Sequence, residues 1–282
     1  MAVEFKTLIA PVGIVRILEV IFTLITVSLV GSLTHQSYSL WVWCIFTWSF
    51  CVSVSLLILI LELFGLSARL PISWNDFTTS FAMLATLMVL AASIIYPVFY
   101  ACSNCGIQIG ATVTSILAFI LYAVEVGLTR AKSGEISGFL ATVPGLLKVL
   151  EAFVACIIFI CLEESIYSHY VGLQWCVAVY SIWFIFSLLV IILTIGRLLA
   201  YLPFEKILIV CNVLAVLMYM TAVVIWPVYV FRNNPRPSYC STHIICRWWD
   251  NLVVISFMTC VNLVAYVVDT VYSFRLVFVS TT

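Results

Sequence analysis

The sequence predicts an all-α polytopic membrane protein with eight transmembrane helices, arranged as two tandem four-helix bundles. Composition is the first reason: 65% of the 282 residues are hydrophobic and 9% are charged, whereas soluble domains are roughly half apolar and a quarter charged. Clustering is the second, because the apolar residues form eight continuous segments, each long enough to cross a bilayer. The third is that the two halves of the chain repeat each other. A soluble fold is therefore excluded.

The eight segments are uniformly apolar and do not alternate, which favours helices over a β-barrel. Their approximate ranges are 14–33, 43–64, 77–97, 109–129, 145–162, 174–195, 206–227 and 251–272. Tyr96-Pro97 and Trp226-Pro227 occupy equivalent places in the third and seventh segments, and we expect both prolines to end a helix. Many aromatic residues lie near segment ends, where interfacial anchoring is expected. They include Trp41, Trp43, Trp74, Tyr96, Trp175, Trp226, Trp248 and Trp249.

An internal repeat divides the chain in two. GIVRILE from Gly13 matches GLLKVLE from Gly145 at a shift of 132, AASIIYPVFY (91–100) matches TAVVIWPVYV (221–230), and LYAVE (121–125) matches AYVVD (265–269). Several matches in the same order indicate duplication of a four-helix unit. We therefore predict domains at 13–132 and 144–275, a cytosolic linker at 133–143, a short cytosolic N-terminus at 1–12 and a cytosolic tail at 276–282.

Basic residues set the predicted orientation. With an even number of spans both termini share one side, and that side holds most of the Lys and Arg in the loops, so both termini are predicted to be cytosolic. The opposite side holds only Arg232, Arg236 and Arg247. The net charge is zero, which gives no reason to expect a nucleic-acid partner.

Seven charged residues fall inside the apolar segments beyond their first residue, all near the predicted cytosolic ends. Arg16/Glu19 and Lys148/Glu151 are equivalent by the repeat, and a spacing of three places each base and acid on one helix face. Burial of an unpaired carboxylate is costly, so we expect these acids to be paired, hydrogen-bonded or protonated. We call the seven residues the polar clamp: Arg16, Glu19, Glu62, Glu125, Lys148, Glu151 and Asp269.

Three interpretations of the polar clamp stay open at this point. It can fix the packing of helices within each bundle, it can be a proton or ion site, or it can bind a lipid headgroup or a partner. The acids form one layer instead of a path across the membrane, and broken midplane helices are not evident, which favours the packing role. A small-solute or ion transporter or channel using the embedded acids is the alternative function.

The cysteines and histidines do not indicate catalysis. Cys102 with Cys105, and Cys240 with Cys246, lie in equivalent outer loops, where an oxidising environment favours one disulfide in each. A redox role for CSNC or a zinc site that adds His243 are alternatives. The three histidines, His35, His169 and His243, all lie in predicted outer loops and cannot reach the cytosolic acids. We predict no catalytic, cofactor-binding or metal-binding residues and no cofactor.

Small residues recur at every fourth position of the fourth segment, at Gly110, Thr114 and Ala118. Such a face lets helices approach closely in lipid. We expect it to pack within its bundle, with an oligomer face or a sterol contact as alternatives.

Several stretches resemble one known family. SFCVSVSLLILILELFGLSARLPISWNDF, AASIIYP, GEISGFLATVPGLLKVLEAFVACIIF and LQWCVAVYSIWF are similar to the myeloid-associated differentiation marker family, which resembles a tandem of four-helix MARVEL domains. The resemblance implies a non-enzymatic plasma-membrane and vesicle protein associated with cholesterol-rich, condensed membrane domains. It also implies roles in membrane organisation, adhesion, trafficking or cortical signalling. The partners expected are membrane lipids, trafficking or cortical proteins on the cytosolic side, and a second copy of the chain in a homo-oligomer.

Overall fold

The computed structural model describes residues 9–33, 39–100, 105–132, 142–196, 204–236 and 247–279. Regular structure within these ranges is helical, and eight of the described helices are long and apolar enough to cross a membrane. The prediction of an all-α polytopic membrane protein is confirmed. The chain divides into two compact units, residues 1–142 with 194–197 and residues 143–193 with 198–282.

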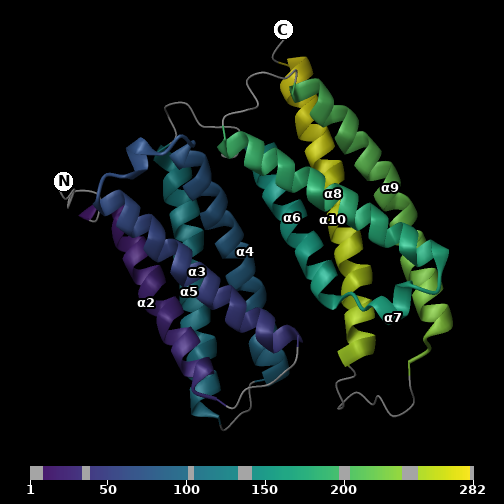
Figure 1. Ribbon diagram of the computed structural model, residues 1–282, viewed down its shortest axis with the longest axis horizontal. Coiled ribbons are helices and arrows are strands. Elements are labelled where there is room, and N and C mark those ends of the chain that lie inside the picture. Colours follow the sequence, from purple (N-terminus) through teal and green to yellow (C-terminus); the bar gives the residue numbers. More distant parts are fainter. Residues whose placement is uncertain are drawn as a thin grey trace. The chain divides into compact units, whose positions relative to one another are not determined.

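The first bundle contains four long helices, and consecutive helices run in alternating directions (Figure 1). Both α2 and α4 pack against α3 and α5. A short 3-10 helix, η1 (Ser67–Arg69), lies between α3 and α4. The four helices are α2 (Pro11–Gly31), α3 (Ser39–Leu63), α4 (Trp74–Tyr100) and α5 (Gly106–Lys132).

The second bundle repeats this arrangement, with the one-turn helix α7 (Glu164–Tyr167) added between its first two long helices (Figure 1). Its long helices are α6 (Val143–Cys161), α8 (Val171–Ile195), α9 (Phe204–Asn233) and α10 (Arg247–Val279). Helix α10 packs against α6 and α9. Helix α8 is held by side chains: Trp175 Nε1 donates to Thr221 Oγ1 at 2.9 Å, and the Tyr180 and Thr259 hydroxyls are 2.9 Å apart.

Aromatic side chains fill the centre of each bundle. In the first, Trp48 packs edge-on against Tyr96 with ring centroids 5.4 Å apart. In the second, Tyr219 stacks on Tyr266 at 5.2 Å. The expectation of interfacial anchoring is wrong for Trp41, Trp43, Tyr96 and Trp226, which are all buried. Proximity to a helix end does not reveal which helix face a ring occupies, and these rings point inward.

The two repeated prolines do not end their helices. Helix α4 continues through Pro97 to Tyr100, and α9 continues through Pro227 to Asn233. The expectation of a helix end at each proline is therefore wrong. Each proline removes one helical hydrogen bond, whereas ending a helix inside lipid leaves several backbone groups without partners.

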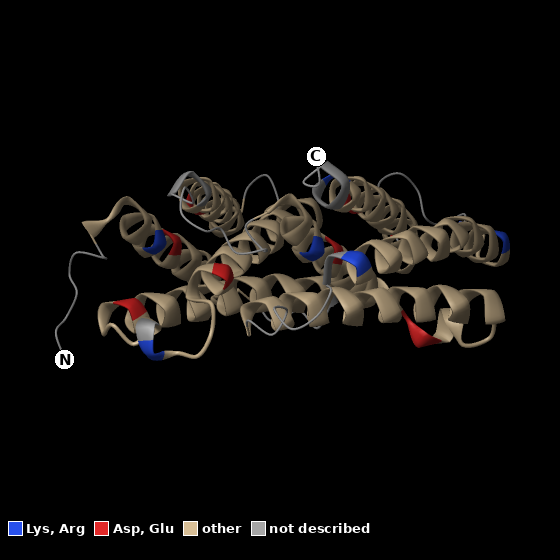
Figure 2. Ribbon diagram, turned by 90° about the horizontal axis from the view of Figure 1, so that it is seen from above, with Lys and Arg blue, Asp and Glu red and all other residues tan. Residues whose placement is uncertain are grey.

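The perimeter of each bundle is apolar. Charged residues colour only short stretches of the ribbon (Figure 2). Large aliphatic and aromatic side chains point outward along the spans, among them Ile185, Ile192 and Phe257. Lipid chains can cover such a surface, so burial here depends on the membrane as much as on the protein.

The small-residue face of α5 packs inside the first bundle. A Cβ atom added at Gly110 would lie 3.6 Å from Leu29 Cδ1 of α2. Thr26 Oγ1 of α2 donates to Thr114 Oγ1 of α5 at 2.8 Å, and Ala118 is fully buried. The expectation of packing within the bundle is confirmed.

Candidate functional site

The first half of the polar clamp centres on Arg16, in the second turn of α2. Its Nη1 donates to Glu62 Oε1 of α3 at 2.6 Å, and its Nε donates to Glu125 Oε1 of α5. Trp74 Nε1, at the start of α4, also donates to Glu62 Oε1 at 2.9 Å. One guanidinium group and its two acids therefore join three helices, and the indole adds the fourth.

The end of α3 explains how Glu62 reaches this position. Gly65 has a left-handed backbone conformation with φ of 62°. The Leu66 and Gly65 amides donate to the carbonyls of Leu61 and Glu62, at 2.9 and 3.1 Å. This Schellman ending, which favours glycine, closes the helix after Leu63, one residue beyond Glu62. The carboxylate therefore lies at the end of the bundle, where its side chain keeps 20% exposure.

Glu19 lies one turn deeper in α2 and is fully buried. Neither of its carboxyl oxygens accepts a hydrogen bond from an N–H group or a hydroxyl among the residues that the structure describes, and its carboxyl group faces that of Glu125, with which it can share a hydrogen bond when one of the two acids is protonated. It lies near enough to Glu125 and Arg16 to interact with both electrostatically. Spacing along α2 puts Glu19 on the same face as Arg16, but the direct contacts of Arg16 are to acids of other helices.

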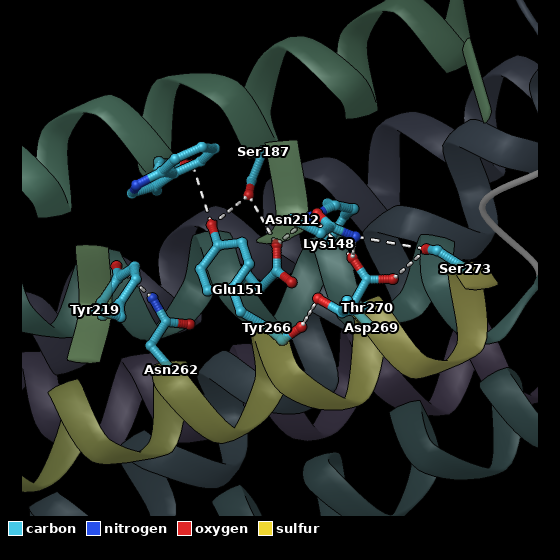
Figure 3. A network of polar contacts seen from close by, with 11 residues as sticks. Lys148, Glu151, Ser187, Asn212, Tyr219, Asn262, Tyr266, Asp269, Thr270 and Ser273 are labelled. Carbon is cyan, nitrogen blue, oxygen red and sulfur yellow. Dashed lines mark hydrogen bonds and ion pairs between the residues drawn. The ribbon is translucent and has the colours of Figure 1, made fainter. Parts of the chain in front are cut away.

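The second half of the polar clamp centres on Lys148 of α6, whose ammonium group uses all three of its N–H donors (Figure 3). These reach Glu151 Oε2 at 2.7 Å, Asp269 Oδ2 at 2.9 Å and Asn212 Oδ1 at 2.7 Å. The Asn212 amide in turn donates to Asp269 Oδ2 at 2.8 Å. Lys148, Asp269 and Asn212 are all fully buried, so this half is sealed from water.

Further polar groups surround this centre. Ser187 Oγ of α8 donates to Glu151 Oε2 at 3.0 Å and lies 3.1 Å from the hydroxyl of Tyr266. The Lys148 ammonium also lies 4.8 Å from the centre of the Tyr266 ring, a cation–π distance. The charge is thus compensated by acids, an amide and an aromatic face, which offsets its desolvation.

Comparison with known proteins gives the family. The sequence model of the membrane-associating MARVEL domain matches twice, at residues 7–128 and 139–272. A Myeloid-associated differentiation marker homolog of Xenopus laevis is 46% identical, over 98% of this chain and 95% of that protein. The chain belongs to the myeloid-associated differentiation marker family. The resemblance inferred from the cytosolic loops and helices is therefore confirmed.

Other members of this family are similarly close. The Myeloid-associated differentiation marker of Homo sapiens is 44% identical over 97% of this chain and 90% of its own length. The Myeloid-associated differentiation marker-like protein 2 of Homo sapiens is 41% identical over 96% of this chain and 93% of its own length. No solved structure matches the chain. The chain is a multi-pass membrane protein of tandem MARVEL type.

Sequence reasoning missed the hydroxyl pairs that accompany the polar clamp. Ser55 and Tyr122 hydroxyls lie 2.8 Å apart in the first bundle, and Ser187 and Tyr266 repeat the contact in the second. The signal was present, because both members of each pair match across the internal repeat. Asn212 was also missed, although it is a rare amide within an apolar span.

The predicted outer-loop sites mostly fall outside the described residues. Cys105 directly precedes α5, whereas Cys102, Cys240, Cys246, His35 and His243 lie beyond the described ranges. Both disulfides therefore stay predictions. Among the described residues, no group of three or more His, Cys, Asp or Glu side chains is placed to hold a metal ion.

Proposed function

We propose that this chain organises cholesterol-rich, condensed membrane domains, and thereby supports membrane trafficking, adhesion or cortical signalling without catalysing a reaction. The observation that carries the proposal is the contrast between interior and perimeter. In each bundle the embedded charges turn inward into one layer, and the outward surface is apolar. A protein built in this way acts on the lipid around it, through the thickness and order that its perimeter prefers.

The packed centre of each bundle favours this role over transport. Trp48, Tyr96 and Tyr122 are fully buried in the first bundle, beyond the ion pairs along the axis. Trp48 Nε1 donates to Ser115 Oγ at 2.9 Å, which ties α3 to α5 across the centre. A conduit needs a hydrated line of polar groups, whereas these large rings occupy the space between the helices.

The proposal extends to location and partners. The family resemblance suggests a location at the plasma membrane and in vesicles, and the distribution of Lys and Arg among the loops predicts that both termini lie in the cytosol. Its lipid partners would be cholesterol-rich domains, and its protein partners would be trafficking or cortical proteins at the cytosolic loops. A homo-oligomer remains part of the proposal.

The test uses the tagged full-length chain in giant vesicles drawn from cell membranes that separate into ordered and disordered phases. We expect enrichment in the ordered phase that disappears on sterol extraction. Proximity labelling from the cytosolic tail in living cells should show a neighbourhood that changes on the same treatment. If sterol extraction changes neither the set of labelled neighbouring proteins nor the share of the chain in the ordered phase, the proposal is refuted.

A surface variant sharpens this test. Ile185→Trp, Leu189→Trp and Ile192→Trp together roughen one exposed strip of α8, at positions that are 56%, 50% and 60% exposed. Ordered lipid chains pack best on a smooth apolar surface, so the ordered-phase share should fall. The matched control, Ile185→Val, Leu189→Ile and Ile192→Val, keeps the strip smooth and should leave the share unchanged. Equal distribution of the two variants would count against a role for the perimeter.

A further inference from the structure

A cavity of about 330 Å³ opens at the end of the first bundle where α2 and α4 begin and α3 and α5 end. This volume lies within the range of small-molecule sites, roughly 300–1,000 Å³. All four helices contribute, together with η1, and the wall is mixed polar and apolar. The lining residues include Arg16, Glu62, Ser67, Trp74, Asn75 and Thr129.

Two charged side chains in this cavity, Arg16 and Glu62, each have a polar atom that forms no hydrogen bond with another described residue. Arg16 is 4% exposed, and its hydrogen bonds use Nε and Nη1, so Nη2 has no partner among the described residues. Glu62 accepts both of its bonds at Oε1, which leaves Oε2 without a partner in the same described set. A guanidinium donor and a carboxylate acceptor therefore both line one space.

The charges select the type of ligand. An anion alone would meet Arg16 but would be repelled by Glu62 and Glu125, and a cation alone would be repelled by Arg16. A molecule with a negative and a positive group, a few ångströms apart, satisfies both sides. Arginine is suited to phosphate, and a carboxylate oxygen accepts well from a primary ammonium group.

The position of the cavity indicates where such a molecule comes from. It lies at the end of membrane-spanning helices, and Trp74 borders it, a residue type enriched at the level of lipid headgroups. A zwitterionic headgroup in the adjacent leaflet would already be held at this depth. Ser67 and Asn75 add a hydroxyl and an amide to the wall.

We propose that this cavity binds the headgroup of a phospholipid that carries a phosphate and a primary ammonium group, as phosphatidylethanolamine does. The phosphate would accept from Arg16 Nη2, and the ammonium group would donate to Glu62 Oε2. This site is independent of the proposed role in condensed domains.

The test measures lipid retained by the purified full-length chain, by native mass spectrometry from vesicles containing equal amounts of phosphatidylethanolamine and phosphatidylcholine. We expect preferential retention of phosphatidylethanolamine, because choline has no N–H to donate. Glu62→Gln removes the charged acceptor and should weaken binding by about tenfold or more, the usual effect of losing a charge-assisted hydrogen bond. Equal retention of both lipids, or unchanged binding by Glu62→Gln, would overturn the proposal.

A second variant fills the cavity without touching a charge. Asn75 is exposed and lines the cavity, so Asn75→Trp should block the site while leaving the ion pairs in place. Ile207 lies near the start of α9 in the second bundle and is 43% exposed, so Ile207→Trp is the matched control. Loss of lipid in the first variant alone supports the proposal, and equal retention by the two variants overturns it.

Soluble glycerophosphoethanolamine identifies the source of the ligand. If acyl chains contribute, this compound should displace the lipid only at concentrations far above that of the lipid itself. Displacement at equal concentration would refute a lipid source and assign the site to a soluble zwitterion of the same chemistry.

Discussion

Each bundle pairs one embedded cation with acids of neighbouring helices, but the two bundles use different cations and differ in how far the ion pairs are closed off from water. In the first, Arg16 binds Glu62 and Glu125 and keeps unused donors beside an open cavity. In the second, all three N–H donors of the Lys148 ammonium group have partners, on Glu151, Asp269 and Asn212, and the Lys148 side chain is completely buried. A guanidinium group has more donors than its protein partners need, whereas an ammonium group can be saturated.

The difference lies in two positions of the repeat. Glu62, at the end of α3, aligns with Thr194, at the end of α8, at the shift of 132. The second bundle therefore has no acid at this position. Asn212 aligns with Ala82 at the shift of 130, so the first bundle lacks the amide. The first bundle therefore has its additional polar group, Glu62, at the open end, whereas the second has its additional polar group, Asn212, in the sealed interior.

Removal of the sealed cation should give the largest effect. Lys148→Met leaves Glu151 and Asp269 buried without a counter-charge, and we expect a loss of about 3–5 kcal/mol in the unfolding free energy of the second bundle. The measurement is modification of the buried thiol of Cys176 by a maleimide across a denaturant series, with peptide mass spectrometry.

The matched variant is Arg16→Met, read at the buried thiol of Cys51 in α3. Its cost should be smaller, because water reaches Glu62 through the cavity. If Cys176 in Lys148→Met and Cys51 in Arg16→Met become reactive at the same denaturant concentration, the difference in closure between the two bundles does not affect their stability.

Loss of the amide should give an intermediate effect. Asn212→Ala leaves one donor of Lys148 unsatisfied and removes a donor from Asp269, at an expected cost of about 2 kcal/mol, read at Cys176. Asn262→Ala is the control, since Asn262 is equally buried but, within the part of the chain that the structure describes, donates to the Tyr219 hydroxyl alone, at 2.7 Å. A larger loss in the control would contradict the assigned role of Asn212.

The repeated hydroxyl pairs should give the smallest effects. Tyr122→Phe and Tyr266→Phe each remove a hydrogen bond to serine, at an expected cost of about 1 kcal/mol. The second should cost slightly more, because the Tyr266 hydroxyl also donates to the Trp183 carbonyl at 3.3 Å. Thiol reactivity at Cys51 and Cys176 distinguishes the two, and the reverse order would indicate that Ser55 matters more than Ser187.

The fold was accessible from the sequence because lipid imposes long apolar segments, and duplication shows how they group. The polar clamp residues were accessible for a related reason, since charges stand out within such segments. Their partners were not, because spacing along α2 relates Arg16 to Glu19, whereas packing of α3 and α5 brings Glu62 and Glu125. Inward-facing rings such as Trp226 were missed because every span end looks alike in the sequence.

The separation of the ion-pair partners along the chain has a consequence for synthesis. Glu125 follows Arg16 by 109 residues, an interval of roughly 5–20 s at ribosomal speeds of about 5–20 residues per second. During that interval α2 can enter the bilayer with Arg16 before Glu125, one of the final partners of Arg16, has been synthesised. Glu19 follows Arg16 by three residues on the same helix face, so it is the first acid that can pair with Arg16 while the later helices are still being made.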